Sequence, residues 1–482
     1  MEKGKKRFFL QTGVLTAIFA VALISSFFSA PFAAAQEEKA RGEYDLGTIT
    51  VTAQKQEENV QEVPVSITVF GEQDIEDKKI ESVQEIADFV PNFMIFDFGG
   101  STLFQPTMRG VSASTMSLTT STGLYVDGVP ISSGVGFEEG MLDIERIEVL
   151  RGPQGTLYGK NTETGVINII TKQPDNEFRG RVSAQGGEDK KGELSLNLSG
   201  PIQKDRLFLG IAGQYYQKDG FIENTTTGDM VDDREHWFGR THLRWTPVDD
   251  LDISLIASRL KYDDGAPNVN MGENGAAMLA MFGLPAPQYR KVTSNMEEEE
   301  NKSSNDSQSL KIAYDISDSL TLTSITTNWV YEDDSLSDWD FSPATLMHGD
   351  KDSEYSKISQ ELRLNYSAER LKWLVGLYYD RDVFDIDYEI ISVIPQMAGV
   401  TSRDVDGHTY AVFANLTYPL TKQLSMIGGL RYEKEKQDFE DNISNLKTDE
   451  SWNKLSPKIA LEYRFTPAIM TYVSASQGYR SG

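Results

Sequence analysis

Few residues of this 482-residue chain have the types and spacing that catalysis requires. The segment Gly155–Lys160 is similar to a phosphate-binding loop, but it has one residue too few between its glycines, and Asn161 stands where Ser or Thr should bind magnesium. The four histidines are scattered, and His236 and His242 lack the i, i+4 spacing of a helical zinc site. No G-x-S-x-G nucleophile motif is present. We therefore predict that the chain is not an enzyme and has no cofactor and no metal site.

The segment from Leu142 to Pro174 carries charges inside a pattern that otherwise looks buried. It predicts two apolar strands separated by a glycine-rich region that supplies tight turns. Charges at such positions need partners, either from the same segment or from a second domain. The charged residues are Glu145, Arg146, Glu148 and Arg151, and the glycines include Gly152, Gly155 and Gly165.

This segment resembles the plug domain of TonB-dependent outer-membrane receptors, and the resemblance extends over residues 48–172. Further family phrases follow in the same order, with Arg109-Gly110 in one and a strand running into an Asp127-Gly128 turn in another. The resemblance implies that these four residues, with the charges and glycines named above, are structural and switch-like parts of the plug. It also implies ion pairs between plug and barrel wall, formed by Arg109, Arg146, Arg151, Glu145 and Glu148.

The N-terminus predicts a cleaved signal peptide over residues 1–35. A basic start precedes the apolar stretch 14–28, and Ala33-Ala34-Ala35 provides small residues at the cleavage point. The mature chain then begins at Gln36 and leaves the cytoplasm. The formal net charge of −27 argues against nucleic-acid binding.

Residues 36–59 predict a charged periplasmic extension with one short β-like run. An exposed strand of this kind can pair with the sheet edge of another protein, although a linker strand that pairs internally is the alternative. The resemblance implies that the run is the TonB box, which the energy-transducing protein TonB grips in the periplasm. It consists of Thr48, Ile49, Thr50, Val51, Thr52 and Ala53.

The sequence pattern of the mature chain changes near Phe178. We expect an N-terminal α+β plug domain over 60–175, in which Ser82 caps an amphipathic helix that Pro91 ends. An antiparallel transmembrane β-barrel over 178–482 is expected to follow, because long strands alternate apolar and polar residues. Tyr410, Val412, Ala414, Leu416 and Tyr418, for example, alternate with Ala411, Phe413, Asn415 and Thr417.

Short and long connections between these strands alternate, as in outer-membrane barrels. Trp245, Tyr366, Tyr418 and Phe465 precede short turns, where a periplasmic aromatic girdle is expected. The predicted long outer loops are 219–235, 263–305, 334–352, 390–405 and 439–451. A soluble β-sandwich or barrel is the alternative.

The sequence predicts about thirteen strands, whereas barrels of the resembled family close with twenty-two. An open sheet edge would leave backbone groups unpaired in lipid. We therefore expect an incomplete barrel that lacks roughly nine strands, on the order of 250 residues. Such a chain should neither insert stably nor transport.

The resemblance implies active import across the outer membrane of a Gram-negative bacterium, with TonB and outer-membrane lipid as partners. A ferric siderophore is the expected ligand, with an oligosaccharide, cobalamin or haem as alternatives in the same family. A passive porin or adhesin is the alternative from a different class. The ligand-binding residues are not identified by the sequence; the weak candidates are Tyr331, Trp339 and Phe341, in acidic aromatic segments.

Overall fold

The computed structural model describes most of the chain from Ile49 onward. The predicted signal peptide, Thr48 and Phe341 lie outside the described residues. The described ranges are 49–97, 104–113, 119–133, 136–265, 280, 283, 289–295, 300–340, 342, 344–466 and 469–481.

A five-stranded mixed sheet forms the centre of the plug, in the order β3-β9-β10-β7-β8. Strand β10 pairs antiparallel with β9 and parallel with β7. Strands β9 and β10 are the two apolar strands that the sequence predicts on either side of the glycine-rich region, and the short helix α4 lies between them. The bounds are β3 Ser66–Gly71, β7 Thr119–Val126, β8 Val129–Ser133, β9 Ile144–Arg151, α4 Gly155–Tyr158 and β10 Gly165–Thr171.

A helix begins after Ser82, as predicted, but it consists of a short α-helix followed by a 3₁₀ turn and is not one continuous α-helix. Ser82 and Glu85 form a capping box at its start, and Val83 and Ile86 are fully buried. The helix α3, Val83–Ile86, passes directly into the 3₁₀ turn η2, Ala87–Phe89. The remaining plug elements are β1 Thr50–Val51, β2 Glu58–Asn59, η1 Val60–Glu62, α2 Glu72–Lys78, β4 Phe93–Asp97, β5 Phe104–Met108 and β6 Val111–Ser112.

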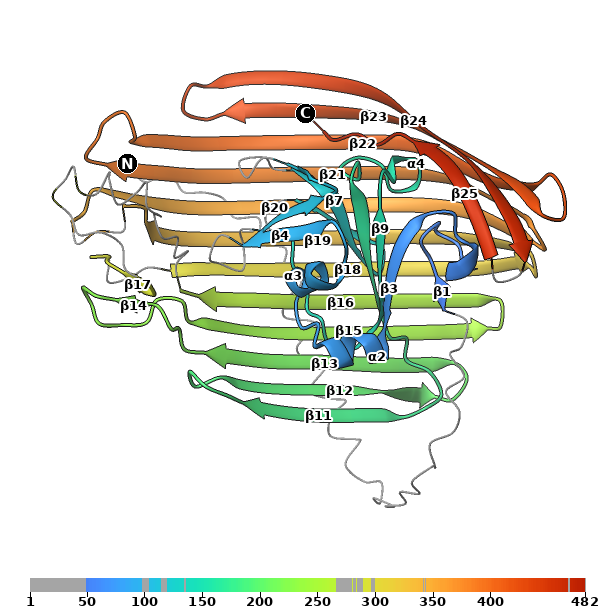
Figure 1. The fold of residues 1–482 in the computed structure, drawn as a ribbon, viewed down its shortest axis with the longest axis horizontal. Helices are drawn as coiled ribbons and strands as arrows, with labels where there is room; N and C mark the ends of the chain where they lie inside the picture. Colours follow the sequence, from blue (N-terminus) through green and yellow to red (C-terminus); the bar gives the residue numbers. More distant parts are fainter. Residues whose placement is uncertain are drawn as a thin grey trace, which may run out of the picture. The chain divides into compact units, whose positions relative to one another are not determined.

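Thirteen antiparallel strands follow in sequence order, as the sequence predicts (Figure 1). Within the described part of the chain, the first and last of these strands have one neighbour each, so the sheet is a partial barrel. Two short strands, β14 Glu223–Asn224 and β17 Lys291–Val292, pair separately. The thirteen are β11 Arg179–Gly186, β12 Gly192–Gln203, β13 Leu207–Lys218, β15 Arg234–Val248, β16 Leu251–Asp264, β18 Glu300–Ser317, β19 Leu320–Asp338, β20 Met347–Ala368, β21 Leu371–Ser392, β22 Gly399–Pro419, β23 Leu424–Asp441, β24 Leu446–Thr466 and β25 Ile469–Ser476.

Three of the predicted long loops are wrong, because most of their residues belong to strands. The segments 334–352, 390–405 and 439–451 pair in register almost to their tips, so that β20 and β21 each reach 22 residues. About ten residues suffice to cross a bilayer. Residues 334–352 and 439–451 are largely polar, which is the composition that also marks a loop, whereas 390–405 contains apolar residues such as Ile390, Ile391 and Val393.

The two faces of the strands follow the predicted alternation. On β22, Tyr410 and Val412 are exposed on the outer face, whereas Phe413 is buried on the face that contacts the plug. At the short-turn end, Trp245 and Phe465 are also exposed, where the aromatic girdle is expected. An apolar outer face and a mixed inner face match a barrel wall in lipid.

The largest hydrophobic cluster joins plug and sheet. Plug residues such as Phe137 and Ile147 pack in it together with Trp329 and Tyr355 of the sheet. The plug therefore shares its core with the wall strands. No helix within the described ranges is both long enough and apolar enough to cross a membrane.

Candidate functional site: the N-terminal hairpin and the plug interface

The β-like run at the N-terminus is docked inside the molecule. Strands β1 and β2 form a small antiparallel hairpin in which Val51 pairs with Glu58. Val51 and Ala53 are almost fully buried, and the backbone N–H of Thr52 donates to Glu148 Oε1 at 2.8 Å. The expectation of an exposed strand is therefore wrong for these residues. Of the described run, Ile49 and Thr50 stay exposed.

Lys55, at the tip of this hairpin, fixes it to the sheet. Its Nζ lies 2.6 Å from Glu361 Oε2 of β20, and it also lies over the rings of Tyr158 and Phe413, 5.1 and 5.2 Å from their centroids. Burial lowers the pKa of Lys55 to about 8, although the carboxylate of Glu361 opposes the shift. The ammonium group is thus held in a site that tolerates its charge mainly because Glu361 is there.

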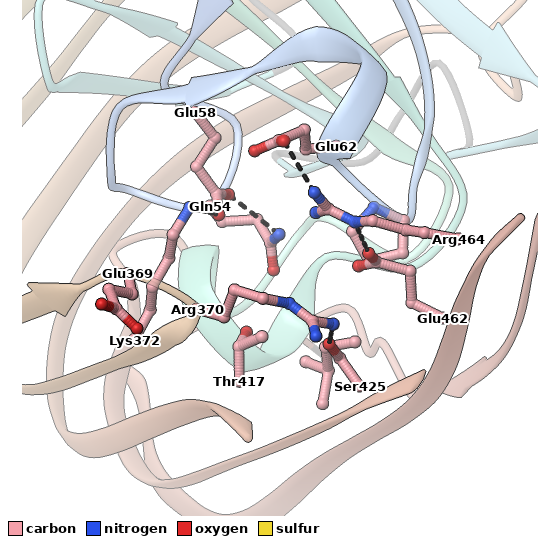
Figure 2. Close-up of a pocket in the computed structure, with 12 residues that line it drawn as sticks. Gln54, Glu58, Glu62, Glu369, Arg370, Lys372, Thr417, Ser425, Glu462 and Arg464 are labelled. Atoms are coloured by element: carbon pink, nitrogen blue, oxygen red, sulfur yellow. Dashed lines mark hydrogen bonds and ion pairs between the residues drawn. The ribbon is translucent and has the colours of Figure 1, made fainter. Parts of the chain in front are cut away.

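A small cavity lies between the hairpin and the sheet (Figure 2). Its volume is about 100 Å³, well below the roughly 300–1,000 Å³ of small-molecule pockets. Two ion pairs join the hairpin side to the sheet side, Lys372 Nζ to Glu58 Oε1 at 2.9 Å and Arg464 Nη1 to Glu62 Oε1 at 2.7 Å. The cavity is a docking interface at the short-turn end of the strands, and it is too small for a nutrient chelate.

The charges of β9 form their pairs within the plug, so the predicted pairs with the barrel wall are wrong for Arg146, Glu145 and Glu148. Arg146 Nε lies 2.9 Å from Glu148 Oε1, and its Nη1 pairs with Glu145. Arg151 donates to the carbonyl of Pro91 at 3.4 Å, not to a wall carboxylate. Glu148 is fully buried and also receives the hydrogen bond from Thr52, so this cluster ties the N-terminal hairpin to the plug sheet.

The predicted plug turns have the backbone that their residues favour. Asp127 and Gly128 both have positive φ, 47° and 88°, as a tight two-residue hairpin turn requires. Gly165 has no room for a side chain, because a Cβ there would lie 2.3 Å from the carbonyl of Leu150. Of the other predicted residues, Arg109, Gly110 and Gly152 have positive φ, the Arg109 guanidinium lies against Gly152, and Gly155 begins α4.

Other residues form the ion pairs between plug and wall. Lys160 Nζ, in the loop after α4, lies 2.9 Å from Glu435 Oε1 and 3.3 Å from Asp382 Oδ1. Burial lowers the pKa of Lys160, but Asp382, Asp380 and Glu435 together hold it well above its usual value. On the other side of the plug, Glu139 pairs with Arg240 at 3.3 Å. In the glycine-rich segment 152–164, Lys160 is the single cation and Glu163 the single acid, and nothing in the segment identifies the distant partners of Lys160.

The three weak ligand candidates separate in the structure. Tyr331 is 2% exposed and packs against Gly136 of the plug, so it belongs to the shared core and cannot meet a ligand in this state. Trp339 is 46% exposed, with its ring 6.5 Å from that of Tyr388. Phe341 lies outside the described residues. Within the described part of the chain, no cluster of three His, Cys, Asp or Glu could hold a metal ion.

Two family descriptions match the chain, one on each structural part. "TonB-dependent Receptor Plug Domain" matches residues 59–166, and "TonB dependent receptor-like, beta-barrel" matches residues 258–482. The chain belongs to the TonB-dependent receptor family. This membership confirms the fold class and the outer-membrane localisation predicted from the sequence.

Relatives of this TonB-dependent receptor include proteins whose names refer to pesticin and to iron. The pesticin receptor of Yersinia pestis is 27% identical over 459 residues, which cover 90% of this chain and 64% of the relative. The iron-regulated outer membrane virulence protein of Vibrio cholerae is 33% identical over 215 residues, 41% of this chain and 30% of the relative. This receptor chain thus spans less than two thirds of the length of these relatives.

Solved structures of the family share the fold. The ferric yersiniabactin uptake receptor FyuA from Yersinia pestis superposes with a TM-score of 0.76 at 24% identity, covering 86% of this chain and 65% of the other. The open form of the ferric-catecholate import receptor Fiu from E. coli K12 gives 0.72 at 16% identity, covering 89% and 71%. These relatives are receptors or transporters and not enzymes, which confirms that prediction.

Proposed function

We propose that this receptor takes part in TonB-driven import of a ferric siderophore across the outer membrane. The plug shares its core with the wall, so a bound ligand cannot pass until the plug is rearranged. The outer membrane has no nucleotide pool, so the work must come from a partner that spans the periplasm. TonB is that partner in this proposal.

The observation that carries the proposal is the docked N-terminal hairpin. Residues Thr50–Ala53 lie at the short-turn end of the strands, held by Lys55 and by the cluster around Glu148. Force applied to this segment acts directly on β9 through the hydrogen bond from Thr52 to Glu148. A docked segment that reaches the plug sheet is suited to act as the TonB box, the role proposed for residues 48–53.

The names of several relatives support iron as the cargo. A ferric yersiniabactin receptor, an iron-regulated virulence protein and a siderophore receptor are among them. A vitamin B12 transporter of Vibrio vulnificus, 31% identical over 248 residues, keeps cobalamin as the second candidate. Oligosaccharide and haem remain family alternatives, and a passive porin or adhesin remains the alternative from another class.

Deleting residues 48–53 from the complete receptor tests the energised mechanism. Uptake of radioiron should stop while binding of the ferric chelate stays intact, because the ligand site lies on the other side of the plug. Unchanged uptake would favour a passive pore. Measuring receptor abundance with and without iron starvation tests the cargo: a strong rise supports a siderophore, and no response points to another nutrient.

A further inference from the structure

Three aromatic rings form a ladder across β13, β15 and β16. Tyr216, His236 and Tyr262 stand directly opposite one another in register. The rings of Tyr216 and His236 stack with centroids 4.7 Å apart and planes 11° apart, and those of His236 and Tyr262 are 5.3 Å apart at 58°. All three side chains are half-buried. Such a stack presents aromatic surface that is ordered yet still open to contact.

The aromatic ladder lies on the inner face of the sheet, near the end of the strands away from the short turns. Phe238 and Arg240 share this face of β15 with His236, and Arg240 contacts Glu139 of the plug. The neighbouring residues Tyr215 and Trp237 point to the outer face and are exposed there. The ladder therefore faces the interior above the plug contact.

Lys191 closes one end of the aromatic ladder and also touches the plug. Its Nζ lies 5.4 Å from the centroid of the Tyr216 ring and 3.9 Å from Oε2 of Glu81, in the segment between α2 and α3. The side chains of Lys191 and Glu81 are 29% and 41% exposed. A long, partly exposed ion pair of this kind is worth little. Burial, with the nearby carboxylate of Glu193, raises the pKa of Glu81, so this carboxylate is poorly accommodated.

We propose that Tyr216, His236 and Tyr262, together with Lys191, bind a ferric chelate whose iron is held by aromatic phenolate or catecholate rings. The inference rests on the proposed siderophore function and names the class of siderophore. Flat aromatic donors stack on aromatic side chains, and their oxygens carry the negative charge that an ammonium group accepts. A hydroxamate chelate offers no ring to the ladder.

The same lysine couples the ligand to the plug. When Lys191 turns to a phenolate oxygen, it leaves Glu81, and the plug loses its contact with the turn between β11 and β12. Glu81 and Glu193 border the site, and Glu193 accepts a hydrogen bond from Gln214 at 2.9 Å. Because of these carboxylates, a small anion without rings should bind poorly, so stacking must supply most of the affinity.

Equilibrium dialysis of the full-length receptor in detergent micelles tests the site. The probes are radioiron complexes of a synthetic tris-catecholate and a synthetic trihydroxamate. Tyr216→Leu and Lys191→Gln should each weaken tris-catecholate binding about tenfold, within the range of stacking and cation contacts. Tyr215→Leu and Lys190→Gln are matched controls, because Tyr215 faces outward and Lys190 pairs with Asp219. Neither control should change binding.

Glu81→Gln separates coupling from simple contact. It removes the competitor for Lys191 and should tighten tris-catecholate binding severalfold, but it should have no effect when Lys191→Gln is already present. If the wild type binds neither chelate, the siderophore function itself fails. If the wild type binds the tris-catecholate but Tyr216→Leu and Lys191→Gln bind it equally well, only the inferred site is overturned. Equal or tighter binding of the trihydroxamate also overturns it.

Discussion

Glu361→Gln should release the N-terminal hairpin from the sheet. The carboxylate of Glu361 neutralises two cations at once, Lys55 at 2.6 Å and Arg363 at 3.1 Å, and all three side chains are nearly buried. Glutamine keeps the size of the side chain and removes its charge. Lys55 would then lie beside Arg363 without a counter-ion. The hairpin that carries Lys55 can remove this uncompensated charge from the buried site by undocking from the sheet.

The magnitude follows from the burial of the pair. Removing one partner of a buried ion pair costs roughly 3–5 kcal/mol. Release of the hairpin limits the loss to the lower end, about 3 kcal/mol, which shifts the docked–released equilibrium about a hundredfold. Replacing Lys55 with Met as well removes the uncompensated cation, and its apolar chain still fits against Tyr158 and Phe413. The double variant should dock again.

Thiol labelling measures the released population. The chain contains no cysteine, and Val51 is fully buried in the docked hairpin, so Val51→Cys provides a single thiol that reacts only after release. Glu361→Gln should raise its labelling rate about a hundredfold, and Lys55→Met should return it to the slow rate. An unchanged rate in Glu361→Gln, or a fast rate that Lys55→Met does not slow, would refute the electrostatic account.

Three further outcomes follow from the plug contacts. Burial raises the pKa of Glu138 to about 8 from 4.5, so protonation favours the folded state. This stability is complete below about pH 4.5 and is lost as the pH rises to about 8; thermal midpoints should fall over that range and change less in Glu138→Gln. Gly140→Ala should destabilise the plug by roughly 1–3 kcal/mol in denaturant titrations, because a Cβ would lie 2.3 Å from the Phe238 ring, whereas Gly71→Ala meets nothing within 4 Å. Lys160→Met leaves buried carboxylates with less compensation and should lower the free energy of unfolding by roughly 3–5 kcal/mol. Lys172→Met breaks a more exposed pair and should lower it by about 1 kcal/mol or less. Equal losses in the two variants would show that burial of the pair is unimportant.

The sequence predicted the strands of the barrel wall correctly in the parts where one face of each strand meets lipid. The alternation of Tyr410, Val412 and Leu416 with Phe413 fixes both the strand and its orientation, because only one face can be apolar throughout. The polar tips of β19, β20, β23 and β24 lack that constraint. Their strand structure comes from backbone pairing with a neighbour, such as Asp334 with Asp352, and composition alone does not distinguish it from a loop.

The charges of β9 show a signal that the sequence contained. Residues two apart on a strand share a face, so Arg146 and Glu148 can pair with each other without a partner on the barrel wall. Lys160 had no such signal, because its partners Asp382 and Glu435 lie more than two hundred residues away and meet it only after the plug docks. Local periodicity predicts pairs within an element, whereas pairs between domains depend on the assembled fold.

A segment with the proposed role of TonB box has to be docked, but only weakly. The run from Thr50 to Ala53 meets both demands by alternation: Val51 and Ala53 face inward, and both are small, so their burial contributes only modestly. Specific placement then comes from polar contacts, among them Lys55 with Glu361 and Thr52 with Glu148. Polar contacts of this kind are lost over a short displacement, whereas a large apolar surface would resist along its whole length. The run therefore fits both a docked hairpin and a strand that pairs with another protein, which explains why its sequence alone did not separate the two.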